Sequence, residues 1–385
     1  MDITLQPGKL SGSVAVPPSK SIVHRMLICA AFSHQPSTIF CTDPGQDIEA
    51  TADCLQALGA EIRRSADAFQ VIPVKKLPDE ARLNCRESGS TLRFLLPIVG
   101  ALGVETAFEM EGRLPQRPLF PLWEEMERMG CRLYWESDFL LRCCGKLRPG
   151  AYRMDGSISS QFISGLMMAL PLIHGQTDLK ITGTVESKPY IRMTQHVLDQ
   201  FSGTHPAQLT PESDWSSAAF WMAANALGSN VEITGLNNAS LQGDRAVTDC
   251  LPKLRENTAI SAKDIPDLIP VLSVVAAAGN GAVFSDIGRL RYKESDRVSA
   301  IAAMLESLGG KAEATEDTLT IFGTGLIGGI VDSYADHRIA MSAAIAATVC
   351  NEPVTVLGAE CVKKSYPGFW EAYASLGGHY EKQLR

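Results

Sequence analysis

The chain has 385 residues, of which 45% are hydrophobic and 20% are charged, and its formal net charge is −8. This length predicts two or three domains with ample core. The net charge argues against a nucleic-acid surface but is compatible with a basic site for small anions. The first residues, Met1-Asp2-Ile3-Thr4, resemble no signal peptide, and the apolar stretches are too short to span a bilayer. We therefore expect a cytoplasmic protein with no membrane partner and no nucleic-acid partner.

The sequence also argues against a metal centre and a nucleotide cofactor. The ten cysteines form no C-x-x-C pair and have no histidine at metal-ligand spacing, which is typical of free thiols in a cytosolic protein. Neither G-x-x-x-x-G-K-[ST] nor a strand followed by G-x-G-x-x-G is present. We therefore expect no metal and no cofactor.

The first candidate site follows an alternating run at 9–16, which predicts a strand. Pro17-Pro18 ends this strand, and Ser19 is a suitable N-cap for a helix over 21–32. Lys20 and Ser21 would lie in the first turn of that helix, and Arg25 would share their face. A helix start attracts anions, so this set is a candidate phosphate or carboxylate site. A capped helix with two solvated basic residues is the simpler alternative.

The same pattern, a polar helix start followed by an Ala/Leu/Met-rich helix, recurs at five later positions: Ser88, Ser159, Asp214, Asp267 and Asp336. Successive starts are 69, 71, 55, 53 and 69 residues apart, which indicates six copies of one repeat unit. In the first copy a helix over 21–32, a strand over 37–41 and a helix over 47–58 precede short strands at 61–65, 68–72 and 81–85. Each unit is therefore expected to contain a helix, a strand, a second helix and a small set of strands.

The last unit, from Asp336, ends after its second helix, and the N-terminal strands at 3–6 and 9–16 could complete it. This closure predicts one domain of units one to three, over 18–212, and another of units four to six, over 1–17 plus 213–385. The expected fold is α/β (α+β type), with three αβα-plus-strands units in each domain.

Units three and four are each about 15 residues shorter than the others, which is the length of a two-stranded hairpin. The shortening falls after the second helix, because only 10 residues separate Gly203 from Ser213, against 28 from Gly59 to Glu87. We expect sheets that are about two strands smaller in these units, with every helix start kept.

Polar and basic residues gather at the predicted helix starts. They lie at 20–21, 88–90, 159–161, 267 and 336–338 on first helices, and at 116–118, 187–190, 293–294 and 363–364 on second helices. We expect these helix N-termini to converge on an interdomain cleft suited to a multiply anionic ligand.

Most of these residues have an ordinary explanation as well. Asp267 and Asp336 could be simple N-caps, and His337 alone would more often be structural. Lys293 and Arg297 are harder to explain, because cations are disfavoured near the positive end of a helix unless an anion is bound. Ser159 and Ser160 have no His/Asp partner pattern, so a nucleophilic triad is not expected.

Taken together, these motifs resemble the enolpyruvyl transferase family, and within it the EPSP synthases (3-phosphoshikimate 1-carboxyvinyltransferases). The matching stretches are PPSKSIVHR (17–25), ESGSTLRF (87–94), PQRPL (115–119), SISSQF (157–162), SKPY (187–190), LQGD (241–244), IPD (265–267), LRYKESDR (290–297), DHR (336–338) and KKSYP (363–367). They follow the family order over nearly the whole chain. The resemblance implies the two-domain enolpyruvyl transferase fold and a monomer, with glyphosate as an inhibitor.

The activity implied by the resemblance is transfer of the enolpyruvyl group of phosphoenolpyruvate (PEP) to the 5-hydroxyl of shikimate 3-phosphate. By motif position, shikimate 3-phosphate would be bound by Ser21, Arg25, Ser159, Ser160, Gln161, Ser187, Tyr190, Asp267 and Lys293. PEP would be bound by Lys20, Gly89, Arg117, Gln161, Arg297, Arg338 and Lys364. Asp267 would act as base, and Glu294 and Lys20 would move the proton at the methylene carbon of PEP.

Some positions depart from the family pattern. Pro18, Glu87 and Phe94 replace residues that are more usual there, and Arg289 stands where an asparagine often binds shikimate. The nearest alternative is a UDP-N-acetylglucosamine enolpyruvyl transferase, but the loop over 112–118 lacks the reactive cysteine of that enzyme. A non-catalytic anion-binding relative is the other alternative.

Overall fold

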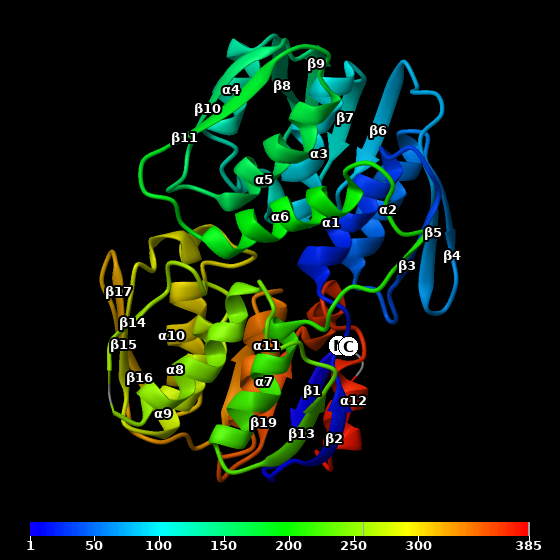
Figure 1. The fold of residues 1–385 in the computed structure, drawn as a ribbon. Coiled ribbons are helices and arrows are strands. Elements are labelled where there is room, and N and C mark those ends of the chain that lie inside the picture. The colour runs from blue at the N-terminus through cyan, green and yellow to red at the C-terminus, as the bar shows by residue number, and fades with distance from the viewer. Residues whose placement is uncertain (257, 384–385) are drawn as a thin grey trace. The chain divides into compact units, whose positions relative to one another are not determined.

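The computed structural model describes residues 1–256 and 258–383. The chain divides into two compact domains (Figure 1). The first domain is Pro18–Pro211, and the second combines Met1–Pro17 with Glu212–Arg385. Each domain has its own hydrophobic core, so we describe each one by itself. No helix in the described residues has the length and apolar character needed to cross a membrane.

The first domain contains six α-helices and two short 3₁₀ helices. They are α1 (Lys20–Ala31), α2 (Gln46–Ala57), α3 (Gly89–Leu102), η1 (Leu114–Gln116), α4 (Leu122–Arg128), α5 (Ser160–Ala169), η2 (Leu170–Leu172) and α6 (Lys188–Phe201). Its strands are β3 (Ser37–Phe40), β4 (Glu61–Arg64), β5 (Ala68–Ile72), β6 (Glu80–Asn84), β7 (Glu105–Glu109), β8 (Cys131–Ser137), β9 (Leu140–Gly145), β10 (Gly150–Asp155), β11 (Thr177–Thr182) and β12 (Gln208–Leu209).

The second domain repeats this content. Its helices are α7 (Trp215–Ala226), η3 (Gly243–Ala246), α8 (Val247–Leu254), α9 (Ile269–Ala278), η4 (Gly288–Tyr292), α10 (Arg297–Ser307), α11 (His337–Ala346), η5 (Ala359–Lys364) and α12 (Phe369–Ser375). Its strands are β1 (Asp2–Leu5), β2 (Ser11–Ala15), β13 (Asn230–Thr234), β14 (Ile260–Ser261), β15 (Ala282–Ser285), β16 (Lys311–Ala314), β17 (Thr318–Phe322), β18 (Gly329–Asp332), β19 (Val354–Leu357) and β20 (Tyr380–Gln383).

The first helices of the units form the centre of each domain, because they are apolar on nearly every side. All of α9 from Ile269 to Ala277 is buried, and so is all of α11. A helix that is apolar all round must be surrounded by other elements. Helices α7, α9 and α11 accordingly pack together in the second domain, and α3 packs on α5 in the first.

Within the described residues, six sheets surround these helices, one for each repeat unit, and four of them have four strands. In each four-stranded sheet the strand after the first helix has a parallel neighbour on one side and an antiparallel neighbour on the other. The central and antiparallel strands pair as β3 with β5, β7 with β9, β15 with β17, and β19 with β1.

The sheets of units three and four contain only two strands each, β10–β11 and β13–β2. The predicted loss of two strands in these units is therefore confirmed. The shortening removes no helix, since α5 and α6 are both present in unit three, and α7 and α8 in unit four.

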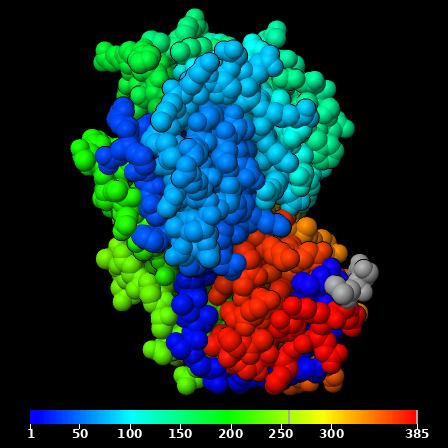
Figure 2. Space-filling model, turned by 90° about the vertical axis from the view of Figure 1, so that its right-hand side faces the viewer, coloured from blue at the N-terminus to red at the C-terminus, as the bar shows by residue number. Residues whose placement is uncertain are grey.

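The two N-terminal strands do not stay together as the sequence analysis expected. β1 completes the sheet of unit six, where Ile3 pairs with Val356, but β2 pairs in parallel with β13 of unit four. The end of the chain supplies a further strand, β20, which also pairs with β1 and was not predicted. In Figure 2 the N-terminal residues (blue) lie against the C-terminal residues (red) within this domain.

Candidate active site

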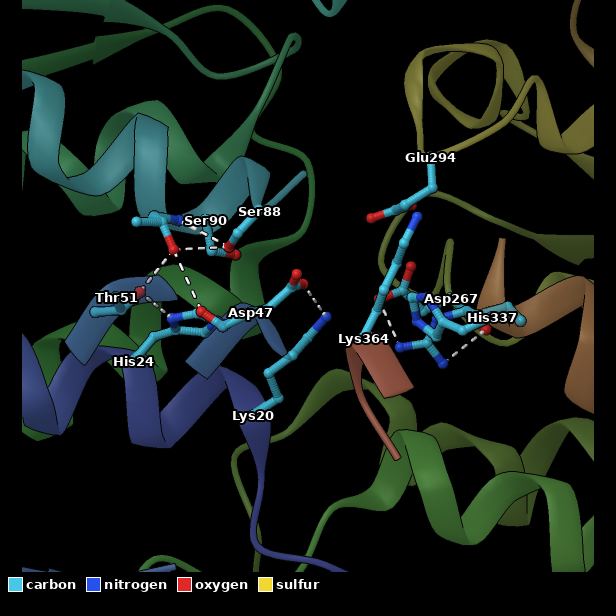
Figure 3. Close-up of polar contacts among 12 residues, drawn as sticks. Lys20, His24, Asp47, Thr51, Ser88, Ser90, Asp267, Glu294, His337 and Lys364 are labelled. Carbon is cyan, nitrogen blue, oxygen red and sulfur yellow. Dashed lines mark hydrogen bonds and ion pairs between the residues drawn. The ribbon is translucent and has the colours of Figure 1, made fainter. Parts of the chain in front are cut away.

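The start of α1 carries the first cluster of predicted site residues. Lys20 is the first residue of the helix, and its Nζ pairs with Asp47 Oδ2 of α2 at 3.0 Å (Figure 3). Ser19 occupies the N-cap position as predicted, but its side chain makes no capping hydrogen bond, so the predicted side-chain cap is wrong. Both members of the ion pair are mostly buried, which fixes the Lys20 ammonium at the helix start.

Arg25 lies one turn further along α1 and connects three helices. Its Nε donates to Thr194 Oγ1 of α6 at 2.7 Å, and its Nη2 donates to Ser164 Oγ of α5 at 3.2 Å. Further bonds from Nη1 and Nη2 end on the carbonyls of Ser21 and Tyr190. Four of the five N–H groups of a guanidinium are thus used within the described residues. Burial lowers the pKa of Arg25 to about 10.

A buried chain of hydrogen bonds joins α1 and α2 to the start of α3 (Figure 3). His24 Nδ1 lies 2.7 Å from Thr51 Oγ1, which lies 2.7 Å from Thr91 Oγ1, and Thr91 donates to Ser88 Oγ at 2.7 Å. Ser88 also accepts from the backbone N–H of Thr91 and so caps α3. This chain of hydrogen bonds fixes the positions of α1 and α2 relative to the start of α3.

The starts of α3 and α5 are joined through Gln161. Its Nε2 donates to Ser90 Oγ at 2.9 Å, and its Oε1 accepts from Arg93 Nη1 at 2.7 Å. Beside them, a Cβ on Gly89 would lie 2.7 Å from Nη1 of Arg117. The backbone at Gly89 can approach the Arg117 guanidinium this closely because glycine has no side chain.

The remaining candidates of the first domain are also at helix starts. Ser159 caps α5 by accepting from the N–H of Gln161 at 3.3 Å, and Ser160 is buried in the first turn. Ser187 is the N-cap of α6 and has a left-handed φ of 52°, which is uncommon for a residue with a Cβ. Tyr190 follows one turn later, and its carbonyl accepts from both Arg25 and Thr194.

In the second domain the candidates surround one carboxylate, that of Asp267. Arg297 Nη1 donates to Asp267 Oδ1 at 2.6 Å, and Arg338 Nη2 donates to Oδ2 at 3.2 Å. Lys293 Nζ lies 3.7 Å from Oδ1. The N-cap position of α9 is Leu268, so the alternative explanation of Asp267 as a simple N-cap is wrong.

Arg297 connects this carboxylate to two others. Its Nε donates to Asp336 Oδ2 at 2.8 Å, and its Nη2 donates to Glu294 Oε2 at 2.8 Å. Asp336 caps α11 as predicted, through the N–H of Arg338. The Arg297 side chain is only 1% exposed, and its guanidinium contacts three carboxylates. These contacts compensate the buried charge and fix the side chain in one orientation.

The charges of this cluster shift one another's pKa values. Desolvation by burial would raise the pKa of Asp267, but Arg338, Lys293 and Arg297 hold it well below its usual range. Burial lowers the pKa of Lys293 to about 8, although Asp267 opposes that shift. Asp267 is therefore anionic at neutral pH, whereas Lys293 titrates just above neutrality.

The basic residues assigned to second helices lie before those helices in three units. Arg117 follows η1, Lys293 follows η4, and Lys364 is the last residue of η5. Lys364 Nζ donates to the carbonyl of Ala335 at 2.7 Å. The corresponding α-helices begin only at Leu122, Arg297 and Phe369. The predicted helix starts were wrong here because the chain makes a 3₁₀ turn first.

The structure adds residues that the sequence analysis did not select. Asp47 pairs with Lys20, and Arg93 holds Gln161. Asp336, which was predicted only as a helix start, also orients Arg297. Asp244, from the LQGD stretch, is also buried, and it accepts from Ser216 Oγ. A carboxylate one or two residues into a helix, like Asp47, looks in sequence like an ordinary partner of the helix dipole.

Each domain thus carries a chemically distinct set of groups. The first offers helix N-termini with hydroxyls, one amide and the cations Lys20 and Arg117. The second offers the carboxylates Asp267 and Glu294 among Lys293, Arg297 and Arg338. Helix N-termini and guanidinium groups bind phosphates and carboxylates, and the carboxylates can exchange protons with a bound ligand.

Comparison with known proteins identifies relatives along the whole chain. Residues 5–259 and 252–373 match the profile of a family described as EPSP synthase (3-phosphoshikimate 1-carboxyvinyltransferase). The chain is 38% identical over 422 residues to the 3-phosphoshikimate 1-carboxyvinyltransferase of Clostridium kluyveri, covering 99% of this chain and 98% of that protein. It is 40% identical over 416 residues to that of Clostridium perfringens, covering 98% of each.

Solved structures show the same fold. The EPSP synthase from Acinetobacter baumannii superposes with a TM-score of 0.77 at 21% identity over 100% of both chains. The enolpyruvyl transferase NikO from Streptomyces tendae superposes with a TM-score of 0.72 at 18% identity, over 100% of this chain and 99% of the other. The predicted two-domain enolpyruvyl transferase fold is thereby confirmed.

Proposed function

The chain belongs to the EPSP synthase (3-phosphoshikimate 1-carboxyvinyltransferase) family, and from that membership we propose which residues carry out the reaction. The enzyme is a transferase that moves the enolpyruvyl group of PEP to shikimate 3-phosphate, in aromatic amino acid biosynthesis. The products are 5-enolpyruvylshikimate 3-phosphate and phosphate. Its partners are therefore two small anionic substrates.

Addition is the first half of the reaction. The 5-hydroxyl oxygen of shikimate 3-phosphate bonds to C2 of PEP and loses its proton, while the methylene carbon C3 gains one. We assign Asp267 to the hydroxyl proton, and Glu294 and Lys20 to the proton at C3. Lys20 is held by Asp47 at 3.0 Å, and Glu294 by Arg297 at 2.8 Å, so both groups are positioned before substrate arrives.

Elimination is the second half. The C2–O bond to phosphate breaks, C3 returns its proton, and the enolpyruvyl double bond forms. Negative charge on the phosphate and carboxylate of the intermediate would be stabilised by Arg117, Arg297, Arg338 and Lys364, with Gln161 and the N–H of Gly89 as further donors. Fixed cations and helix N-termini need no rearrangement as this charge develops, which is how such sites lower a barrier.

The observation that carries this assignment is the Asp267 carboxylate surrounded by three cations. With no ligand bound, these cations keep the pKa of Asp267 well below its usual range, and so make it a weak base. Anionic PEP bound at Arg297 and Arg338 would neutralise the charge of these two cations. The pKa of Asp267 would then rise, so the base would become stronger only when PEP is present.

For shikimate 3-phosphate we propose the hydroxyls of Ser21, Ser159, Ser160, Ser187 and Tyr190, with Lys293 as the charged partner. By motif position Arg25 belongs to the same ligand, but most of its N–H groups already bind the protein. We therefore propose that Arg25 mainly positions the starts of α5 and α6, and that at most one N–H reaches the substrate.

The test is phosphate release from PEP, measured with shikimate 3-phosphate and separately with UDP-N-acetylglucosamine. We expect turnover with the first acceptor only. Turnover with the second would assign the chain to the sister activity, and tight PEP binding with no release would indicate a non-catalytic relative.

We also propose that the enzyme acts as a cytoplasmic monomer. The ten cysteines are all free thiols, which supports a reducing compartment. Sedimentation of the purified protein and fractionation of the source cells would test the two parts of this proposal.

A further inference from the structure

Two hollows lie beside the shortened repeat units. A groove of about 510 Å³ is lined by unit three and by the end of α1, and a cavity of about 580 Å³ is lined by parts of units four, five and six. The second is lined by the ends of helices and loops, without β13. The first differs, because its wall includes Thr177 and Leu179 of the edge strand β11.

The groove has an apolar floor. Helix α1 contributes Ile28, α5 contributes Met167, α6 contributes Leu198 and Phe201, and Phe32 follows α1. Most of these side chains are only partly buried. Apolar surface of this kind on the floor of a groove is typical of a binding site.

The other repeat units show what normally covers this position. In each four-stranded sheet an antiparallel strand pairs with the strand equivalent to β11. Each of these covering strands carries two fully buried apolar side chains two positions apart. The pairs are Phe69 and Val71 in β5, Leu141 and Cys143 in β9, Leu319 and Ile321 in β17, and Ile3 and Leu5 in β1.

β11 has no such neighbour, since it pairs only with β10 in the part of the chain that is described. Thr177 and Leu179 face the groove, while Asp178 and Lys180 are exposed on the opposite face. An added antiparallel strand would therefore place apolar residues opposite Thr177 and Leu179. It would gain two cross-strand ion pairs from a basic residue opposite Asp178 and an acidic residue opposite Lys180.

We propose that this groove binds an extended peptide segment of another protein, which adds an antiparallel strand to β11. Read from its N-terminus, the segment carries an acidic, an apolar, a basic and an apolar residue in succession. Edge addition of this kind takes affinity from main-chain hydrogen bonds and specificity from alternate side chains.

A second copy of the enzyme does not fit the groove as well as a peptide does. β11 of another copy has the right order, Asp178-Leu179-Lys180-Ile181, but it already lies on its own helices. The floor of the groove is occupied by α1, α5 and α6, so no second layer of helices can enter beneath the added strand. An extended segment without a packed layer of its own has no such conflict.

Lys180 also bears on selectivity. A lysine on an edge strand is a common way to discourage pairing with other chains. With Asp178 beside it on the same face, the edge presents both signs of charge. An added strand with a basic residue opposite Asp178 and an acidic residue opposite Lys180 is therefore favoured. A strand in which these two residues are exchanged places like charges opposite each other at both positions.

The experiment uses two fluorescein-labelled peptides of identical composition. One contains Glu-Leu-Lys-Ile between flexible Ser/Gly ends, and the other contains Lys-Leu-Glu-Ile. Fluorescence anisotropy with the full-length enzyme should show about tenfold tighter binding of the first, because two favourable charge pairs become two repulsive ones. In the double variant Asp178→Lys with Lys180→Glu the preference should reverse.

Hydrogen exchange locates the binding. Amides within Thr177–Thr182 should exchange more slowly when the first peptide is present. Binding should be lost when the unit-five hairpin, Lys311–Phe322, is inserted after Gly203 to cover the groove. Equal affinity for the two peptides, no reversal in the double variant, no protection of β11, or no binding at millimolar peptide would each overturn the proposal.

Discussion

Arg297 Nη1 donates to Asp267 Oδ1 at 2.6 Å, so an almost fully buried cation is bound to the proposed base. Replacing Asp267 by asparagine removes the base but keeps the size of the side chain. We expect kcat to fall by roughly 10²–10⁴-fold with a smaller change in KM for shikimate 3-phosphate, since a base acts in the transition state. Steady-state kinetics would measure both, with Asp249→Asn, an exposed change on α8, as control. Near-normal turnover of Asp267→Asn would remove Asp267 from the mechanism.

We expect the titration of Lys293 to lower kcat/KM on the basic side of the pH profile. Burial lowers its pKa to about 8, so in the free enzyme its charge is lost as the pH rises through that value. Since the cation attracts shikimate 3-phosphate, kcat/KM for this substrate should fall between about pH 7.5 and 9. Lys293→Arg keeps the charge over this range and should flatten the profile. An identical fall in Lys293→Arg would show that another group titrates.

Gly89→Ala tests the close approach of backbone and Arg117. The added methyl would lie 2.7 Å from Nη1 of Arg117 and would force the guanidinium to move. We expect weaker binding of both PEP and glyphosate, with the larger loss for glyphosate, because the longer inhibitor leaves less room for the displaced side chain. KM for PEP and Ki for glyphosate measure the two effects.

The same change in an Arg117→Lys background is the matched control. If the methyl acts through Arg117, its effect on PEP should shrink there, since the two changes would not be additive. Equal losses for PEP and glyphosate in the original background would contradict the prediction.

Asp244 should make the stability of the enzyme depend on pH near neutrality. Burial, followed by the nearby charge of Asp267, raises the pKa of Asp244 to about 7. The unfolded chain ionises this group near the ordinary pKa of an aspartate, so between that pH and about 7 the folded state holds a proton that the unfolded state has lost. The folded protein should therefore lose stability from pH 5 to pH 7, and the loss should level off above that.

Asp244→Asn removes that ionisation and should lose less stability over the same interval. Thermal unfolding of both proteins at the two pH values measures the difference, and other titrating groups contribute equally to both. Parallel curves would show that Asp244 does not titrate in this range.

The repeat pattern in the sequence predicted much of the architecture, because the number of residues between successive helix starts limits how many strands each unit can contain. The distance from Gly203 to Ser213 leaves no room for two strands, and the sheet of unit three indeed contains two. The partner of β2 could not be predicted in this way. Its alternating pattern fits any sheet of the domain, and only the packed structure selects β13.

Candidate site residues could be proposed from the sequence where an unusual residue type stood at a helix start, as with Lys20 and Arg297. They could not be proposed where an ordinary residue gains its role from a distant partner. Asp47 is one acidic residue in the first turn of α2, and only the fold brings it to Lys20. Arg25 shows the opposite problem, since a basic residue near a helix start does not reveal that it binds three helices.

The pairing of β1 with β19 sets the order in which the protein can form during synthesis. Ile3 pairs with Val356, which is synthesised 353 residues later, so β1 waits over that length of chain for this partner. At about 5–20 residues per second this takes roughly 20–70 s. Residues 18–211 contain a complete domain and can fold meanwhile. The first strand therefore stays exposed on the ribosome while the domain encoded after it assembles, so it needs protection from other chains for longer than any other strand of the protein.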